Sequence, residues 1–452
     1  MKGIVKKIRF RMVAVLSALL LASPLQTLKA QDVLSDGAYT PYSLFGLGDL
    51  VRQGTAYSLS MGGIGIADRN VRYINLLNPA AVTAREAKSF MMDFGIENRN
   101  TIYQGNAATS LSETAQGVLK SASNTTTMHH IVMSLPIASR GAFKLGVMPY
   151  SHVAYNFQAD ETSDALISEM GDIRYAKSGT GSVNQAFIGA GVSLWRLNIG
   201  ADLDYYFGKI ERFSGAYFTT TTSYRTIRSG WDYNVSSFGG KLGLQYTQPL
   251  SRTLSAVLGV TYTLPMQVRG NQTRFAEGLT ASATDTVISQ TSKMTDYRNP
   301  GELGVGISLR NADRWSMGFD YTRQDWSGLL AGSTPGVDFK AVTAQNFRGG
   351  FEITPNRYDV RSGFGHFLRR LSYRGGAYHE LSYMQLNGKQ VTSTGVTFGV
   401  GIPVFRYYNS INLGVDFGQR GTLGSNQIRE RYFLFTVSFN LHDIWFIKPL
   451  YN

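Results

Sequence analysis

Glycine and amide residues between positions 62 and 80 are the first candidates for chemistry in this sequence. Gly62, Gly63 and Gly65 stand close together, and the triplet Asn78-Pro79-Ala80 follows them. Glycines can let a backbone approach a phosphate where they join a strand to the N-terminus of a helix. Here no apolar strand run precedes them, and the third glycine of the dinucleotide-binding fingerprint is missing. The cluster is weak evidence for a nucleotide site, so its role depends on its place in the fold.

Histidine and carboxylate residues suggest no catalytic centre. His129 and His130 are adjacent on a predicted strand, so we expect their side chains to point to opposite faces and not to bind one metal ion together. Asp202 and Asp204 share a face about 7 Å apart by strand rise. Such a pair could do acid–base work, but a solvated pair or a contact with another segment is the simpler interpretation. No Gly-x-Ser-x-Gly elbow occurs. We expect no enzyme activity, no metal and no cofactor.

The first thirty residues have the pattern of a secretory signal. A cationic start precedes the apolar stretch Met12–Ala22, and Ala30 offers a small residue before Gln31. An uncleaved anchor is the alternative interpretation. The chain has no cysteine, which argues against a lipoprotein and against disulfides. Without the six Lys and Arg of residues 1–30, the formal charge falls from +13 to +7. The remaining charges are scattered, so we expect no nucleic-acid partner.

Alternation with a period of two dominates the rest of the chain. Trp315 and Phe319 share one face of a predicted strand, and Leu413, Val415 and Phe417 share one face of another. The opposite faces carry glycines, hydroxyls, amides and isolated Asp residues, with few of the Lys and Glu that coat a solvated sheet. A soluble sandwich would also alternate, but this second face suits a lumen, with the apolar face toward lipid. Open edges are costly in hydrocarbon, so the sheet should close.

The predicted fold class is all-β, a transmembrane antiparallel β-barrel of fourteen strands. The predicted strands are 88–97, 128–137, 141–156, 183–194, 196–213, 231–247, 252–267, 302–310, 314–325, 343–353, 370–384, 394–402, 409–418 and 429–441. Long polar connections (98–127, 157–182, 214–230, 268–300 and 326–342) alternate with short turns (138–140, 195, 248–251, 311–313 and 405–408). The connection 354–369 is longer than the other turns, and we expect a helical turn in it. Long loops outside and an even strand count would place both termini in the periplasm of a Gram-negative bacterium.

A plug within the barrel lumen is the expected role of residues 31–87. They precede the first strand and lack strand periodicity, and a barrel this wide is not filled by its own side chains. Ile64, Ile66, Leu76 and Leu77 should form one side of an apolar pocket. The predicted organisation is a signal peptide (1–30), plug (31–87), barrel (88–441) and periplasmic tail (442–452), in which Trp445 and Phe446 would anchor at the membrane interface.

The plug and the strand count together resemble the long-chain fatty-acid outer-membrane transporters, the FadL-like family. The segment "GTAYSLSMGGIGIADRNVRYINLLNPAAVT" is similar to the hatch of that family. The matching positions are Gly62, Gly63, Ala67, Asp68, Asn78, Pro79 and Ala80. The resemblance implies diffusion of hydrophobic molecules past the hatch and lateral exit through a wall gap at a kinked strand. The family commonly ends in a terminal Phe, whereas here the segment "HDIWFIKPLYN" ends the chain.

Two functions of different class follow from these observations. The first is passive uptake of hydrophobic molecules such as long-chain fatty acids, with a hydrophobic small molecule, outer-membrane lipid and the barrel-assembly machinery as partners. The second is a non-transporting barrel that anchors or assists a secretion or surface-assembly complex. A transporter needs a continuous apolar pocket beside the plug, whereas an anchor can have a sealed lumen. A polar porin is disfavoured by the plug.

Overall fold

A computed structural model gives the fold of the chain. It describes residues 39–86, 88–106, 118–137, 140–218, 224–279, 284–295, 297–329, 338–404, 409–425 and 427–444. The expected signal peptide, the turn 405–408 and the tail residues Trp445 and Phe446 lie outside these ranges. Within the described residues, no helix is long and apolar enough to cross a membrane.

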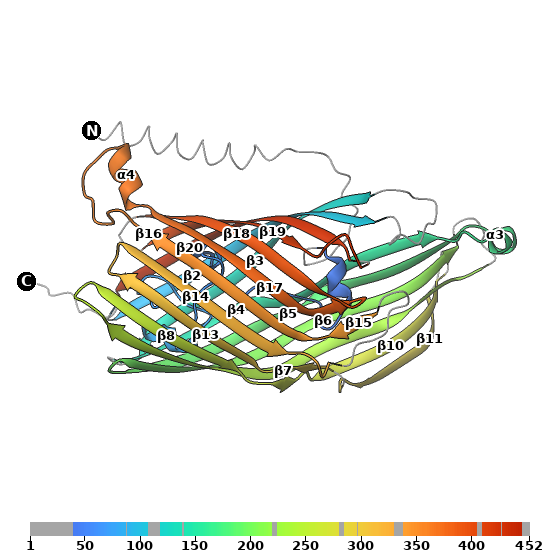
Figure 1. The fold of residues 1–452 in the computed structure, drawn as a ribbon. Helices are drawn as coiled ribbons and strands as arrows, with labels where there is room; N and C mark the ends of the chain where they lie inside the picture. Colours follow the sequence, from blue (N-terminus) through green and yellow to red (C-terminus); the bar gives the residue numbers. More distant parts are fainter. Residues whose placement is uncertain are drawn as a thin grey trace, which may run out of the picture. The chain divides into compact units, whose positions relative to one another are not determined.

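Fourteen antiparallel strands close into a barrel within the described residues, which confirms the predicted fold class (Figure 1). The wall strands are β2 (Ser89–Asn106), β3 (Val118–Ile137), β4 (Gly141–Asp160), β5 (Ile173–Leu194), β6 (Leu197–Phe218), β7 (Thr226–Pro249), β8 (Leu254–Thr263), β13 (Glu302–Asn311), β14 (Trp315–Asp325), β16 (Thr343–Ile353), β17 (Ser372–Leu386), β18 (Lys389–Pro403), β19 (Ser410–Arg420) and β20 (Arg429–Ile444). The last strand pairs with the first, since Ile444 lies opposite Ser89. Closure leaves no free edge along this seam, as hydrocarbon requires.

Apolar side chains turn outward on the wall strands, as the alternation predicts. Phe319 and Phe417 are 48% and 49% exposed in the isolated chain, whereas Asp320 and Asp416 beside them are 3% and 7% exposed. Trp315, Leu413 and Val415 lie on the same outward parity, each half-buried by its neighbours. The inward face therefore carries the polar residues, and the outward face meets lipid.

Several predicted loops are in part strand, because their Ser- and Thr-rich ends still pair with neighbours. β3 begins at Val118, β5 at Ile173 and β7 at Thr226, each five or more residues before the predicted start. The expected loop 268–300 contains a hairpin of β10 (Gly270–Leu279) and β11 (Thr284–Lys293). Hydroxyl-rich strands can face water on both sides, and the apolar alternation used for prediction then disappears.

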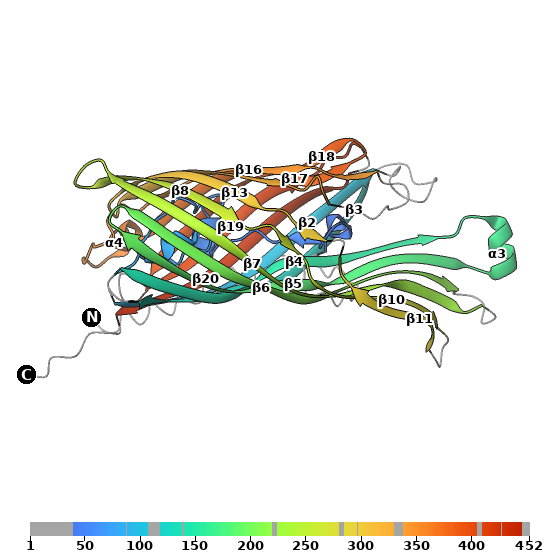
Figure 2. The ribbon, with the colours of Figure 1, turned by 90° about the horizontal axis from the view of Figure 1, so that it is seen from below.

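These longer strands form a sheet extension at the end of the barrel that carries the long connections. β10 pairs with the first half of β7, and the extension reaches the short helix α3 (Asp164–Met170) (Figure 2). Shorter elements complete the fold. They are η1 (Pro41–Leu44), β1 (Asp49–Leu50), α2 (Ala56–Leu59), η2 (Pro79–Thr83), β9 (Met266–Gln267), β12 (Arg298–Asn299), β15 (Phe339–Ala341) and α4 (Phe364–Arg370). The last of these is the helical turn expected in residues 354–369.

Strands β3 and β4 pair over only part of their length, which leaves a gap in the wall ladder. Their paired residues are 131–137 and 141–147. Beyond Val147, β4 has a register shift at Tyr150 against β5, a β-bulge that bends the strand. This part of the β4 edge, which β3 does not pair with, pairs instead with β1 of the N-terminal segment. The pairing is antiparallel, with Leu50 opposite Ser151. Two further backbone hydrogen bonds, from Val51 to Tyr150 at 2.9 Å and from Thr40 to Ala154 at 2.8 Å, extend this contact.

Residues 39–86, here called the hatch segment, lie within the closed sheet. Their backbone contacts inward-facing side chains of strands on different sides of the barrel: Gly62 meets Thr397 of β18, and Gly65 meets Asp320 of β14. Asn78 meets the backbone of Leu244 in β7. Most hatch residues from Gly54 to Val82 are buried. The N-terminal part of the segment pairs with β4, and the remainder contacts the inward face of the wall.

The outward position of Val415 gives a direct test of the barrel. A charge at mid-bilayer on the lipid face costs about 2–4 kcal/mol, so we expect Val415→Arg to lower the free energy of unfolding in bilayers by that amount. Arg252→Glu in an exposed turn is the matched control and should change it little. Because the chain has no cysteine, Val415→Cys can also be probed with a water-soluble maleimide. Rapid labelling at position 415 would contradict the lipid-facing assignment.

Candidate functional site

Glycines 62 and 63 turn the hatch segment against the wall. Both have left-handed backbone conformations, with φ of +72° and +81°, which favour glycine. A Cβ on Gly62 would lie 2.7 Å from the carbonyl oxygens of Ala377 and Gly349, so the position also needs the absence of a side chain. The glycine cluster thus serves a close approach of two backbones. Within the described residues, irregular backbone follows the cluster as far as η2.

Wall side chains satisfy the backbone of this turn. The Asp320 carboxylate accepts hydrogen bonds from the amides of Gly65 at 2.6 Å and Ile66 at 2.8 Å. The Gly62 amide donates to the Thr397 hydroxyl at 2.7 Å. Irregular backbone away from water must find such partners. Polar residues on the lumen face of the strands are therefore acceptors for the hatch.

The Asn78-Pro79-Ala80 triplet forms a corner at the start of η2. Asn78 is fully buried, and its amide donates to the carbonyl oxygens of Ile66 at 2.7 Å and Leu244 at 3.3 Å. Its side-chain oxygen accepts from the amide of Ala80 at 3.0 Å, which caps the helical turn. Pro79 occupies the first position of η2, where no amide is needed. Asn78 therefore ties two parts of the hatch to β7.

Wall glycines make room for this corner. A Cβ on Gly243 would lie 2.1 Å from Asn78 Oδ1, and one on Gly200 would lie 2.5 Å from the backbone of Pro79. Both glycines belong to the small-residue face that the alternation identified in the sequence. Part of the glycine content of the barrel is thus explained by contact with the hatch.

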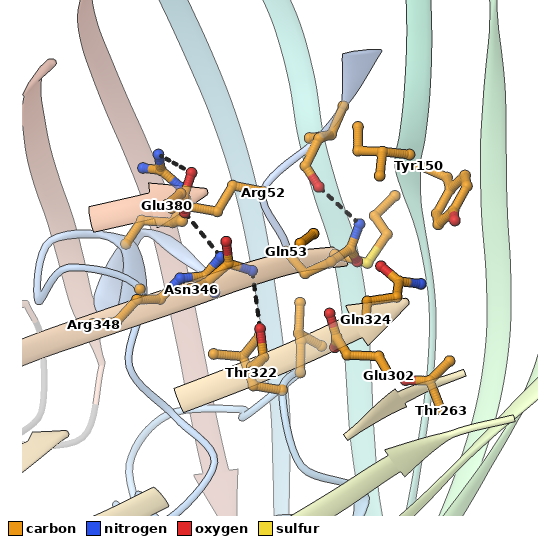
Figure 3. Close-up of a pocket in the computed structure, with 18 of the residues that line it drawn as sticks. Arg52, Gln53, Tyr150, Thr263, Glu302, Thr322, Gln324, Asn346, Arg348 and Glu380 are labelled. Carbon is orange, nitrogen blue, oxygen red and sulfur yellow. Dashed lines mark hydrogen bonds and ion pairs between the residues drawn. The ribbon is translucent and has the colours of Figure 1, made fainter. Parts of the chain in front are cut away.

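Part-buried ion pairs join the hatch to the inward face of the wall. Arg52 of the hatch lies 2.7 Å from Asp416 and 3.2 Å from Glu380, and its guanidinium stacks on the Tyr378 ring. Arg348 shares Glu380 at 3.0 Å, so the two arginines converge on one carboxylate (Figure 3). Buried charges need partners and hydrogen bonds of this kind.

Further pairs repeat this pattern elsewhere in the hatch. Asp49 binds Arg420 at 2.6 Å, and Asp68 binds Arg310 at 2.8 Å. Burial lowers the pKa of Arg69 to about 10, and the neighbouring Asp68 offsets part of this effect. The acidic residue of the predicted hatch motif is thus an ion-pair partner of the wall.

A cavity of about 310 Å³ lies beside the hatch, and about a third of its lining residues are charged. Ile66, Leu76 and Leu77 of the predicted apolar group line it, together with Arg52, Glu302 and other charged residues of both signs. Ile64 instead packs with Tyr57, Met61 and Tyr73 in a buried cluster of the hatch. The structure therefore brings three of the four predicted residues to one cavity. The lining as a whole mixes apolar and polar surface in similar amounts.

The paired carboxylates predicted on β6 both face this cavity. Asp202 pairs with Lys144 at 3.0 Å, and Asp204 accepts a hydrogen bond from Gln185 at 2.8 Å. Lys144 also donates to the Asn75 carbonyl of the hatch at 3.4 Å. The pair is thus linked to the hatch through Lys144, one of the two roles expected from the sequence.

The prediction that His129 and His130 point to opposite faces is wrong. A β-bulge in β3 places His130 opposite Gly95 and Met128 opposite Ile96, so His129 is the extra residue. Both rings are buried, and their Nδ1 atoms lie 3.0 Å apart. His130 Nε2 also contacts Asp93 at 2.8 Å. The strict alternation assumed for adjacent residues does not hold at a bulge.

A second cavity of about 410 Å³, here called the aromatic vestibule, is lined by strands of the sheet extension and by hatch residues 44–46. Its rings are Phe45, Tyr155, Phe213, Trp231, Tyr233, Phe275, Tyr297 and Phe339. Three cations, Lys177, Arg212 and Arg274, also line it, and no Asp or Glu does so among the described residues. Arg212 donates to the Ser43 carbonyl of the hatch at 3.2 Å. The vestibule thus combines an apolar surface with unneutralised positive charge, next to the hatch residues that seal β4.

A protein-family model and several solved structures are similar to this chain. A family model described as BamG matches residues 6–452, nearly the whole chain. The chain belongs to the BamG family. No curated protein matches it.

Solved structures similar to this BamG-family chain include toluene transporters and a FadL homologue. The Pseudomonas putida toluene transporter TodX has a TM-score of 0.54 at 14% identity, covering 88% of this chain and all of that one. The Ralstonia pickettii toluene transporter TbuX has a TM-score of 0.51 at 15% identity, with 86% and 98% covered. A Pseudomonas aeruginosa FadL homologue has a TM-score of 0.50 at 10% identity, with 87% and 99% covered. These likenesses confirm the FadL-like barrel fold inferred from the sequence.

Sequence reasoning missed the vestibule and the central ion pairs. The vestibule residues belong to several strands and to the hatch segment, and Arg52 is a single charge in an irregular segment. The sequence carries one sign of the ion pairs. Arginines and carboxylates fall on the predicted lumen faces, where a purely apolar conduit would not need them. Pairing them with the hatch needs the three-dimensional register.

Asp320 offers a test of how the hatch is held. We expect Asp320→Ala to loosen residues 61–72, because hydrogen bonds to a charged group contribute about 1.5–3 kcal/mol each. Trypsin should then cleave after Arg69 or Arg72, which are protected in the native protein. Asp320→Asn keeps one acceptor oxygen and should have a smaller effect. Equal protection of Asp320→Ala and the native protein would show that these bonds do not hold the hatch.

Proposed function

We propose that this BamG-family barrel is an integral outer-membrane channel for passive uptake of hydrophobic molecules, such as long-chain fatty acids. In this proposal the sheet extension lies outside the cell, and both termini are periplasmic. The observation that carries the proposal is the wall gap between β3 and β4, which the hatch residues 40–51 close. A molecule leaving through this gap would not cross the charged centre of the lumen.

The vestibule is the proposed entry site. Its aromatic lining could bury an apolar body, which gains about 0.8 kcal/mol per methylene removed from water. Lys177, Arg212 and Arg274 could receive a carboxylate, since no acidic residue among the described lining residues neutralises them. Leu44 and Phe45 of the hatch form part of the vestibule wall. The same short segment therefore faces the entry site and seals the exit.

Release would require residues 40–51 to separate from β4. In the closed state they are held by the β1–β4 pairing and by Asp49, which Arg420 binds. The more interior hatch motif has a different proposed role. Gly62, Gly63, Asp68, Asn78, Pro79 and Ala80 would fix the remainder of the hatch while this segment moves. Ile66, Leu76 and Leu77 would line the inner side of the path.

A second function is favoured by the family match and by the central ion pairs. The name BamG is related to the barrel-assembly machinery, and that family model matches residues 6–452. The transporters described above are at most 15% identical to this chain. The lumen beside the hatch is charged and fastened by Arg52, which suits a sealed barrel. In this alternative the chain is a subunit of an outer-membrane assembly or secretion complex, and its outer surface binds the other components of that complex.

A reversible crosslink across the wall gap tests the uptake proposal. Leu50→Cys/Ser151→Cys joins two residues that lie opposite each other in the β1–β4 ladder. Oxidation should reduce uptake of radiolabelled oleate to the level of cells that lack the protein, and reduction should restore it. Gln419→Cys/Arg431→Cys joins two wall strands that are already paired, and its oxidation should leave uptake unchanged.

The same cells distinguish the two functions. If uptake of oleate and toluene is the same with and without the protein, the transport proposal fails. The assembly alternative then predicts that loss of the protein lowers the amounts of other outer-membrane barrels, and that the native protein co-purifies with assembly components. Normal levels of these barrels, with no co-purifying component, would contradict the alternative.

A further inference from the structure

The connection between β16 and β17 exposes a group of large apolar side chains. Val360 and Phe364 are 80% and 77% exposed, and Tyr358 and Leu368 are 50% and 37% exposed. Val360, Phe364 and Leu368 are spaced four residues apart, and the last two lie one turn apart on α4. Exposed apolar side chains gathered in one short segment mark a contact surface.

Hydrogen bonds hold this connection in a defined conformation. The Asp359 carboxylate accepts from Arg361 at 3.0 Å and contacts His366 at 2.9 Å. The Arg357 guanidinium donates to the hydroxyls of Thr354 at 3.0 Å and Ser372 at 2.8 Å, which lie at the two ends of the loop. The apolar side chains are therefore presented by an ordered loop.

The loop continues the lipid-facing surface of the barrel. Ile353 and Tyr373 lie opposite each other at the ends of β16 and β17, and both are exposed on the outward face, at 47% and 37%. The Tyr373 hydroxyl donates to the Leu368 carbonyl at 3.0 Å, which fixes the end of α4 beside this outward ring. Figure 1 shows α4 projecting beyond the wall at the end of the barrel opposite the sheet extension. The helix thus lies at the margin of the apolar belt.

The charge of the loop suits a phospholipid surface. Residues 354–371 contain four arginines and one acidic residue, Asp359, which Arg361 and His366 already bind. Arg369 and Arg370 lie in the last turn of α4. Arginines next to an apolar helix face are typical of segments that lie in the headgroup region, where the cations meet phosphates and the apolar side chains enter the acyl boundary.

We propose that residues 354–371 form an interfacial anchor that binds the phospholipid leaflet at this end of the barrel. The apolar side chains Val360, Phe364 and Leu368 would enter the acyl region, while Arg369 and Arg370 bind phosphate groups. With the sidedness proposed above, this is the inner leaflet of the outer membrane. The anchor would fix the rotation and depth of the barrel at one side of its circumference.

Fluorescence in nanodiscs tests this anchor. Phe364→Cys, labelled with an environment-sensitive NBD dye, should show blue-shifted emission in discs of phosphatidylcholine and phosphatidylglycerol. Lipids spin-labelled near the headgroup should quench it strongly. Dye at Arg252→Cys, in another exposed turn at the same end, should emit as in water. The chain has no native cysteine, so each label is unique.

A charge variant separates lipid binding from folding. Arg369→Glu/Arg370→Glu should reduce quenching at position 364 in anionic discs, while the barrel keeps its heat-modifiable migration on gels. Water-like emission at position 364 in discs would overturn the proposal. So would a photocrosslinker at position 364 that captures one discrete protein in cells and no lipid, since the surface would then bind a protein partner.

Discussion

An irregular polypeptide segment inside a membrane barrel must have every buried backbone group and charge satisfied by the protein itself. About fifty residues of this chain meet that requirement within a closed sheet. Asp320 and Thr397 accept from hatch amides, while Arg420, Arg310 and Glu380 neutralise hatch charges. Leaving such groups without partners costs several kcal/mol each in a low-dielectric interior. The polar lumen face and the hatch therefore depend on each other.

The same requirement explains the composition of the wall. Glycines at 200 and 243 accept the Asn-Pro corner, and Gly350 and Gly376 lie against the Met61–Gly62 backbone. Outward positions instead carry aliphatic and aromatic residues that suit lipid. Where β3 and β4 separate, the backbone edge of β4 has no wall strand beside it. The hatch strand β1 pairs with this edge instead. The weakest part of the wall and the N-terminal part of the hatch are thus one structural unit.

The fold was largely predictable, because period-two alternation is a local property of each strand. The strand count and the short turns follow from this alternation. The helical turn α4 was expected because the connection 354–369 is longer than the other turns. Strand extensions such as Val118–Thr127 were missed, since residues wet on both faces show no alternation. His129 was misplaced because a bulge breaks the period without a clear local signal.

The candidate site was less accessible to sequence reasoning. Asn78 and the glycines were identifiable from their types and spacing, because turns and caps depend on local chemistry. Arg52 and Arg348 converge on Glu380, although Arg52 is 328 positions from Glu380 in the sequence. Only the barrel register brings these residues together. The three cations of the vestibule lie on three different strands, so they too come together only in the folded barrel.

Hydrogen–deuterium exchange of the hatch amides tests the central claim most directly. If wall side chains and ion pairs hold the hatch within the lumen, the amides of Gly62, Gly65 and Ile66 should exchange as slowly as those of the central wall strands in the purified barrel. The amides of α3, in an exposed connection, should exchange within seconds. Fast exchange at Gly62, Gly65 and Ile66 in a barrel whose strands remain protected would contradict the account.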